Sequence, residues 1–222
     1  MKKPFIAVID YDISNITSML NALVAIGATA LPTRDPAQIE AAEALILPGV
    51  GAFRQGMDNL RKYNLLDPIL QHISRNKPFL GVCLGMQLLM EESEEFGITP
   101  GLGVIKGKVR KLAVQPASRD KLPHIGWNAL HQTQTGGWSG TILEGIPEPS
   151  DLYFVHSFAV EPDDCNLTLS VTDFGGRRFC SALQRGAING CQFHPEKSGV
   201  TGLSILRNFV TLAGRRTDDG KP

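Results

Sequence analysis

No C-x-x-C pair occurs among the four cysteines of this 222-residue chain, which are Cys83, Cys165, Cys180 and Cys191. This spacing indicates neither a zinc site nor a disulfide framework. An excess of one charge is also missing, because 22 acidic residues balance 22 basic ones, so no nucleic-acid or membrane partner is indicated. The apolar run that begins at Phe5 is too short for a signal peptide or a membrane span. We therefore expect a cytoplasmic protein with reduced cysteines.

Neither a Walker A pattern nor a dinucleotide fingerprint occurs in the sequence, and we expect no cofactor and no metal. There is also no repeat, no low-complexity linker and no break in composition. A chain of this length can bury a core of its own. We expect a single domain over residues 1–213, followed by a polar C-terminal tail over residues 214–222.

Strand-like and helical patterns alternate in the first half of the chain, where Ser14 or Asn15 can cap the first helix. This alternation predicts an α/β fold with three layers, in which a doubly wound parallel sheet has helices on both faces. The second half consists mainly of strand-like runs joined by short turns, which predicts a mixed or antiparallel extension of the sheet. The expected strands are 5–10, 28–31, 44–47, 79–82, 104–112, 152–155, 167–173, 179–184 and 187–192, and the last helix is 202–213.

Residues 77–90 contain a candidate catalytic residue, a cysteine between a buried strand and a run of helix formers that starts at Leu84. Gly81 and Gly85 flank Cys83 at two residues on either side, which is the G-x-nucleophile-x-G pattern of a strand-to-helix elbow. Glycine fits there because larger side chains would collide with the neighbouring strand and helix. A helix start also favours a thiolate. The pattern predicts that Cys83 is a nucleophile.

A nucleophilic cysteine needs a base and the base needs an orienting group, for which His194 and Glu196 are the candidates. Pro195 favours an extended backbone at His194, where residues two apart point the same way. Glu196 can then orient the imidazole toward Cys83.

The oxyanion needs backbone donors. The N–H of Leu84 is one candidate, and the glycine-rich loop Gly49-Val50-Gly51 can supply the other.

Each piece also has an ordinary structural explanation. Taken alone, Cys83 fits a buried structural cysteine, His-Pro-Glu a surface turn, and Pro-Gly-Val-Gly a simple loop. The other three cysteines are best interpreted as small hydrophobic residues. All three pieces, however, are predicted at strand ends of one sheet, which favours a common active site.

The stretches Gly81–Gln87 and Phe193–Glu196 resemble the class I (triad) glutamine amidotransferases. The stretches 47–53, 123–128 and 153–158 are most similar to one family among them, the glutaminase subunits of imidazole glycerol phosphate synthase. The resemblance covers roughly residues 5–213. It implies a flavodoxin-like fold and hydrolysis of L-glutamine through a Cys83 thioester, with Cys83, His194 and Glu196 as the triad. It implies oxyanion donors at Val50, Gly51 and Leu84, and glutamine contacts at Gln87, Ser157, Phe158 and Gly49.

The same resemblance implies a partner. The family passes ammonia through a tunnel to a (β/α)8-barrel cyclase subunit, with which it forms a heterodimer. That subunit makes imidazole glycerol phosphate for histidine biosynthesis and an aminoimidazole carboxamide ribotide. The residues that resemble the partner-facing surface are Gly126, Trp127, Asn128 and Lys197. Phe158 and Lys106 depart from the family pattern, in which tyrosine and proline are expected.

Several alternatives remain open. A paralogous glutaminase supplies ammonia to an enzyme that aminates a surface-polysaccharide sugar. Relatives that feed anthranilate, GMP or carbamoyl phosphate synthesis are disfavoured by Met86 and the Gly-Trp-Asn stretch. The intact Cys83, His194 and Glu196 argue against a non-catalytic scaffold for the synthase partner. A plain cysteine hydrolase on the same elbow would leave Gln87 unexplained.

Overall fold

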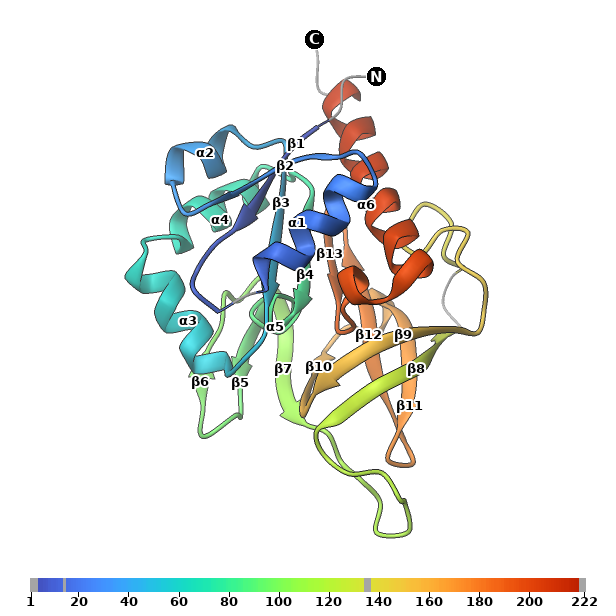
Figure 1. Cartoon of the computed structure of the whole chain (residues 1–222). Helices are drawn as coiled ribbons and strands as arrows, with labels where there is room; N and C mark the ends of the chain where they lie inside the picture. The colour runs from blue at the N-terminus through green and yellow to red at the C-terminus, as the bar shows by residue number, and fades with distance from the viewer. Residues whose placement is uncertain (1–3, 14, 134–136, 220–222) are drawn as a thin grey trace.

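The computed structural model describes residues 4–13, 15–133 and 137–219 (Figure 1). A nine-stranded sheet runs through the molecule in the order β2-β1-β3-β4-β13-β12-β11-β8-β9. The first five strands of that order pair in parallel and the rest in antiparallel fashion. The parallel core with an antiparallel extension is therefore confirmed. The strands are β1 (Phe5–Ile9), β2 (Thr29–Thr33), β3 (Ala44–Gly49), β4 (Phe79–Cys83), β8 (His124–Gln132), β9 (Ser150–His156), β11 (Thr168–Phe174), β12 (Arg177–Arg185) and β13 (Ile188–Cys191).

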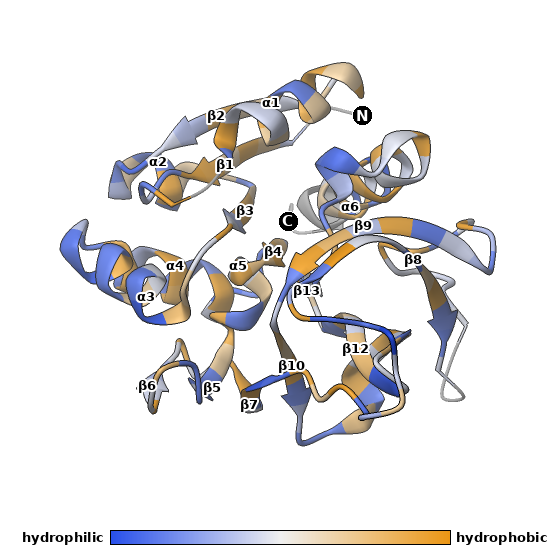
Figure 2. Ribbon diagram, turned by 60° about the horizontal axis from the view of Figure 1, so that its bottom comes forward, coloured by the Kyte–Doolittle hydropathy of each residue, from blue (hydrophilic) through white to orange (hydrophobic). Residues whose placement is uncertain are grey.

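Helices cover both faces of the parallel strands, as Figure 2 shows. Helices α1 (Ile16–Ala25) and α6 (Gly199–Asp219) pack on one face with Met19 and Phe209 in the core. Helices α2 (Pro36–Ala41), α3 (Phe53–Lys62) and α4 (Leu66–Ser74) pack on the other. The three-layer, doubly wound arrangement is confirmed. Asn15 caps α1 by accepting the N–H of Ser18 at 3.3 Å, whereas Ser14 lies outside the described residues.

A second, four-stranded sheet has the order β10-β7-β5-β6. It consists of β5 (Met90–Ser93), β6 (Thr99–Pro100), β7 (Ile105–Lys111) and β10 (Phe158–Pro162). Of the strands in the two sheets, β5, β6, β8 and β10 were not expected from the sequence. In β8 the exposed face carries Ile125 and Trp127, so the alternation of apolar and polar residues that marks a half-buried strand is missing.

The elbow helix is much shorter than expected. The helix formers that start at Leu84 continue to Glu91 in the sequence, but α5 (Leu84–Gln87) makes only one turn and the chain enters β5 at Met90. Backbone bonds to the second sheet explain the early end. The carbonyl of Leu89 accepts the N–H groups of Val104 and Ile105 at 3.0 and 2.9 Å. These bonds draw the segment out of a helix.

The C-terminal helix is longer than expected at both ends, since α6 begins at Gly199 and continues to Asp219. Residues 214–219 of the expected tail are thus helical, and the boundary between domain and tail at residue 213 stays a prediction. Among the described residues, no helix has the length and apolar character needed to cross a membrane.

Strand register brings three segments to one edge of the sheet. Gly49 at the end of β3 pairs with Cys83 at the end of β4, and Val82 pairs with Cys191 at the end of β13. The residues that follow Gly49 and Cys191 therefore emerge beside Cys83. Crevices at the carboxyl ends of parallel strands are where ligands bind in such folds.

Candidate active site

Cys83 occupies the elbow in a conformation that few non-glycine residues adopt. Its φ of 52° and ψ of −107° place it between β4 and α5, and its side chain is almost buried, with 4% of the residue exposed. A Cβ on Gly81 would lie 2.6 Å from the carbonyl oxygen of Gly85, and a Cβ on Gly85 would overlap the carbonyl oxygen of Leu47 on β3. Both glycines are therefore required by the close approach of the helix and the neighbouring strand, as the sequence predicted.

His194 and Glu196 lie together after β13, in the short 3-10 turn Pro195–Lys197 and the residue before it. Glu196 Oε1 is 2.9 Å from His194 Nδ1, and both side chains are nearly buried. The buried Nε2 of His194 has no hydrogen-bond partner among the described residues. Burial disfavours the charged imidazole, but the nearby Cys83 sulfur and the Glu196 carboxylate outweigh it and raise the pKa of His194 to about 10. The imidazolium is therefore the resting form at neutral pH.

A cavity of about 180 Å³ opens above the cysteine. Predicted residues from three segments line it, namely Gly51, Cys83, Leu84, Gln87, Ser157 and Phe158. The structure thus brings together the elbow, the loop after β3 and the segment between β9 and β10. A cavity of this size suits a small amino acid rather than a polymer.

Of the two expected donors in the 49–51 loop, one is already used. The backbone N–H of Val50 donates to the carbonyl of Ile13 at 3.0 Å. Gly51, with a φ of 134°, lines the cavity, and its N–H has no hydrogen-bond partner among the described residues. The Leu84 N–H begins α5 directly after Cys83. The N–H groups of Gly51 and Leu84 are therefore better placed than that of Val50 to donate to an oxyanion, and the oxyanion site stays a prediction.

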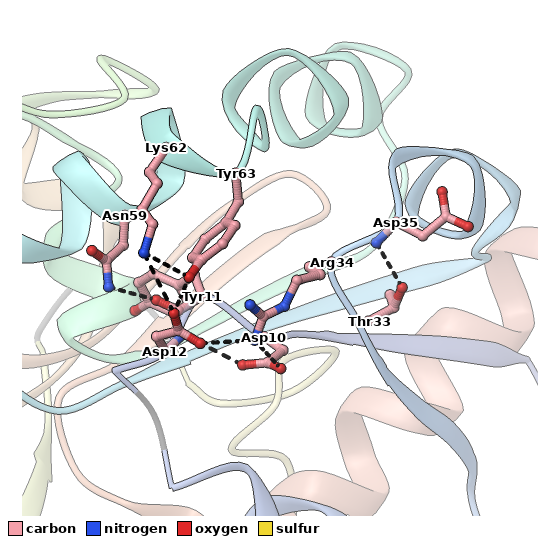
Figure 3. Close-up of polar contacts among 9 residues, drawn as sticks. All are labelled: Asp10, Tyr11, Asp12, Thr33, Arg34, Asp35, Asn59, Lys62 and Tyr63. Atoms are coloured by element: carbon pink, nitrogen blue, oxygen red, sulfur yellow. Dashed lines mark hydrogen bonds and ion pairs between the residues drawn. The ribbon is translucent and has the colours of Figure 1, made fainter.

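The loop after β1, in which the Ile13 carbonyl accepts the Val50 N–H, is itself fixed by a polar network (Figure 3). Arg34 bridges Asp10 and Asp12 at 2.6 and 2.8 Å. Asn59 Nδ2 donates to the carbonyl of Tyr11 at 2.8 Å. The buried Tyr11 ring lies so close to Gly49 that a Cβ there would overlap its hydroxyl oxygen. Gly49 thus acts as a packing position beneath the loop.

Gln87 and Phe158 are linked to each other. Gln87 Nε2 donates to the carbonyl of Phe158 at 2.8 Å and to Gln192 Oε1 at 3.0 Å. Both of its N–H groups are occupied, so only its Oε1 remains to accept from a ligand. The carbonyl of Ser157 accepts the N–H of Leu112 at 2.9 Å. A ligand can therefore meet Ser157 and Phe158 through N–H groups rather than through these carbonyls.

Glu95 also lines the cavity, although no role is predicted for it from the sequence. It lies between β5 and β6, and its Oε2 accepts the N–H of Phe53 at the start of α3 at 2.7 Å. A carboxylate in this cavity suits a cationic ligand group. No spacing or motif in the Glu-Glu-Phe-Gly stretch points to it, because its place depends on the unexpected hairpin of β5 and β6.

Two of the four residues expected to face a partner, Trp127 and Lys197, are exposed, whereas Gly126 and Asn128 are half-buried. Trp127 is 58% exposed, and its ring centroid is 6.1 Å from that of Tyr153. Lys197 Nζ lies 6.0 Å from the same Tyr153 ring. Asn128 instead turns inward, where its Nδ2 donates to the carbonyl of Asp173 at 2.8 Å. Gly126 has a φ of 145° beside Trp127. Trp127 and Lys197 thus both lie beside the Tyr153 ring and form one surface cluster with it.

The other cysteines show no sign of chemistry. Cys180 and Cys191 are buried, and burial raises the pKa of the Cys180 thiol to about 12 and that of Cys191 well above its usual value. Cys165 is exposed. Within the described part of the chain, no cluster of His, Cys, Asp and Glu has the arrangement of a metal site.

Curated relatives resemble this chain over nearly its whole length. A family model described as "Glutamine amidotransferase class-I" matches residues 7–213. The imidazole glycerol phosphate synthase subunit HisH of Synechococcus sp. (strain JA-3-3Ab) is 44% identical over 216 residues, which cover 97% of each chain. The subunit HisH of Thermosynechococcus vestitus is 43% identical over 212 residues, which cover 96% of this chain and 99% of that protein. The subunit HisH 1 of Legionella pneumophila (strain Lens) is 41% identical, with 93% and 99% covered.

Solved structures share the fold at lower sequence identity. A crystal structure of a glutamine amidotransferase superimposes with a TM-score of 0.70 at 19% identity, with 94% of this chain and 98% of that chain covered. The structure of PurLQS from Thermotoga maritima gives a TM-score of 0.68 at 20% identity, with 95% of this chain and 99% of that chain covered. The predicted flavodoxin-like amidotransferase fold is therefore confirmed.

Proposed function

This chain belongs to the class I glutamine amidotransferases and, among them, to the HisH subunits of imidazole glycerol phosphate synthase, and we propose that it uses the Cys83 site to release ammonia from L-glutamine. The observation that carries the proposal is that Cys83 and Glu95 line one small cavity, while the His194–Glu196 pair lies close enough to the Cys83 sulfur to raise the pKa of the imidazole. A nucleophile, a charged proton donor and a carboxylate for a ligand cation then occupy a single site.

The first half of the reaction forms a thioester. The Cys83 thiolate attacks the side-chain carbonyl carbon of glutamine, and the N–H groups of Leu84 and Gly51 bind the oxyanion that develops. His194, held by Glu196, protonates the leaving nitrogen. The tetrahedral intermediate collapses to a glutamyl thioester on Cys83, and ammonia leaves. The raised pKa of His194 suits this step, because the imidazole enters it already protonated.

The second half releases glutamate. His194, neutral after protonating the nitrogen, takes a proton from water as the water oxygen attacks the thioester carbon. The second tetrahedral intermediate expels Cys83 as thiolate. Glutamate leaves, and His194 is again an imidazolium. Both halves of the reaction are thus carried by side chains and backbone groups of this chain.

The amino-acid end of glutamine has suitable partners in the same cavity. Its α-ammonium fits between Glu95 and the free Oε1 of Gln87, both of which are acceptors. Its carboxylate fits the N–H groups near Ser157 and Phe158. A hydroxyl contact from residue 158 is not available, because phenylalanine stands there.

The relatives are named as subunits of a synthase, and the exposed cluster of Trp127, Tyr153 and Lys197 offers a docking surface beside the site. We place a (β/α)8-barrel cyclase subunit on this surface, in a cytoplasmic heterodimer. Ammonia passes to that subunit, which makes imidazole glycerol phosphate and an aminoimidazole carboxamide ribotide in histidine biosynthesis.

The decisive experiment mixes this chain with the cyclase subunit encoded in the same genome and measures glutamate release with and without the cyclase's nucleotide substrate. We expect little release by the chain alone and strong stimulation by the loaded cyclase. Stimulation by a sugar-aminating barrel enzyme instead would assign the chain to the paralogous pathway. Absence of glutaminase activity with either partner would contradict the proposal.

A further inference from the structure

Gln192 contacts the nucleophile, although it has no role in the sequence motif or in the two halves of the proposed reaction. It follows β13 directly and is completely buried. Its Nε2 lies 3.4 Å from Cys83 Sγ, within hydrogen-bond distance for sulfur. The oxygen and nitrogen of a side-chain amide have similar shapes, so its direction must be deduced from its partners.

The backbone carbonyl of Phe158 sets that direction. A carbonyl can only accept, so the Gln87 atom 2.8 Å from it must be the NH₂ nitrogen. The same nitrogen lies 3.0 Å from Gln192 and must meet an acceptor there as well, which is Oε1. The NH₂ group of Gln192 then faces Cys83 Sγ. The opposite orientation of Gln192 would bring two NH₂ groups together.

The same carbonyl also orders a pair of buried histidines. His156 Nδ1 lies 2.8 Å from the Phe158 carbonyl and must carry a proton. Burial lowers the pKa of His156 to about 3 and that of His124 to about 4, so both rings are neutral. His156 Nε2 is therefore an acceptor, and His124 Nδ1, 3.1 Å away, donates to it. The free His124 Nε2 can accept from Asn128 Nδ2 at 3.4 Å.

Aromatic packing fixes this histidine pair. The rings of His124 and Phe154 stack with centroids 5.0 Å apart, and the ring centroids of His156 and Phe179 are also 5.0 Å apart. The Phe158 carbonyl thus receives two donors from rigid, buried groups. Its position, and with it the direction of the two glutamines, is set by the fold rather than by solvent.

We propose that Gln192 is a further catalytic residue, which donates a hydrogen bond to the Cys83 thiolate and is held in that direction by Gln87 and the Phe158 carbonyl. The proposal rests on the proposed function, because it assigns a role at the same nucleophile. Gln87 and His156 are positioning residues, since they act through Gln192 and the carbonyl. A neutral donor favours the thiolate without taking the proton that His194 must deliver. This support is needed because α5, with four residues, supplies little helix dipole.

The test measures thiolate reactivity and turnover in two variants of full-length protein. Gln192→Met removes the donor and keeps the length of the side chain, while Gln192→Glu replaces the donor with a carboxylate that repels the thiolate. We expect alkylation of Cys83 by iodoacetamide at pH 7 to slow by about tenfold in the first and further in the second, because a hydrogen bond to a charged group has about this effect. In the complex with the cyclase, kcat for glutamate release falls in parallel, and KM changes less.

Asn189→Leu is the matched control. Asn189 is another buried amide on β13, and its Nδ2 donates to the carbonyl of Ala187 at 3.2 Å, away from Cys83. The Asn189 variant shows how far the loss of a buried amide that does not contact Cys83 changes the alkylation rate and the stability. We expect wild-type alkylation rates in this variant, with thermal unfolding of all variants followed in parallel.

The role of the histidine pair is tested by His156→Phe, with His72→Phe as its control. His72 is also a buried histidine, and its Nε2 is 3.0 Å from the Pro78 carbonyl at the other end of β4. We expect slower alkylation of Cys83 in the first variant only. Wild-type alkylation and turnover in both Gln192 variants would overturn the proposal. Failure of the proposed function would look different, because wild-type protein would then release no glutamate even with its partner.

Discussion

Oxygen Oε1 of Glu196 lies 2.9 Å from Nδ1 of His194, and only 4% and 3% of the two side chains are exposed. This contact fixes which nitrogen of the imidazole points away toward the cysteine. Glu196→Gln keeps the shape but can present an NH₂ group to Nδ1, which favours the wrong tautomer. We expect kcat for glutamate release to fall by about three orders of magnitude or more, as when the acid of a triad is replaced by its amide. Glu161→Gln is the control. Glu161 is an exposed carboxylate that pairs with Arg110, so its replacement should leave kcat unchanged.

Stability should depend on pH through the same pair. The folded-state pKa of His194 is raised from 6.5 to about 10, so its contribution to stability is fully present below pH 6.5 and is lost as the pH rises through 10. Urea unfolding of the wild type should therefore show a falling contribution across this window. His194→Asn should not show it. Equal pH dependence in both proteins between pH 6.5 and 10 would contradict the assignment.

Gly81 and Gly85 should tolerate no side chain. An alanine Cβ at Gly85 would overlap the Leu47 carbonyl oxygen, which belongs to the sheet backbone and cannot move aside. We expect Gly85→Ala to destabilise the fold by about 3 kcal/mol or more, at the upper end of overpacking effects, and to abolish glutaminase activity. Gly137→Ala is the control, because no atom of the described residues lies within 4 Å of a Cβ there. Chemical denaturation of the wild type and the two variants measures the difference.

The elements that the sequence predicted are those whose signals are local. The alternating strands and helices up to β4 have strong apolar patterns, and the elbow needs its glycines at fixed spacing. The contact of His194 with Glu196 was expected from an extended backbone, but only His194 is extended, and Glu196 reaches the imidazole from the 3-10 turn Pro195–Lys197. Strands β5 and β6 were missed because Leu88 to Met90 read as helix formers, and only tertiary bonds to residues 102–105 override that preference.

The same limit applies to the site, where only residues with local sequence signals could be predicted. Groups that lie next to a motif were found, whereas Glu95 and Gln192 were not assigned roles. Glu95 reaches the cavity through the hairpin that was missed. The hydrogen bond of Gln192 to sulfur depends on the Phe158 carbonyl, which comes from a distant segment. Such long-range juxtapositions leave no periodic trace in a sequence.

Glu95 should control affinity more than rate. Glu95→Gln keeps an oxygen for the Phe53 N–H but removes the negative charge that would pair with the α-ammonium of glutamine. We expect KM for glutamine to rise by about tenfold, with a smaller change in kcat, because a charged hydrogen bond is replaced by a neutral one. Glu94→Gln is the matched control, since Glu94 pairs with Arg110 at the surface. An unchanged KM in the Glu95 variant would remove the carboxylate from the substrate site.

Cys83→Ala should separate the two activities of the synthase. Without the sulfur no thioester forms, so glutamate release falls to the background of the assay. The fold should persist, because alanine leaves the strand and the turn intact and shortens a side chain that already faces a cavity. In complex with the cyclase, synthesis from added ammonium salts should therefore proceed as with wild type, since ammonia then enters the cyclase without the glutaminase.

Cys165→Ala serves as the control for that experiment, because Cys165 is an exposed cysteine outside the site. Glutamine-dependent and ammonia-dependent synthesis should both be normal in this variant. Glutamate release by Cys83→Ala at more than trace level would mean that another group is the nucleophile. Loss of the ammonia-dependent reaction, by contrast, would mean that the elbow also holds the cyclase in its active form, and the two assays on one variant distinguish these outcomes.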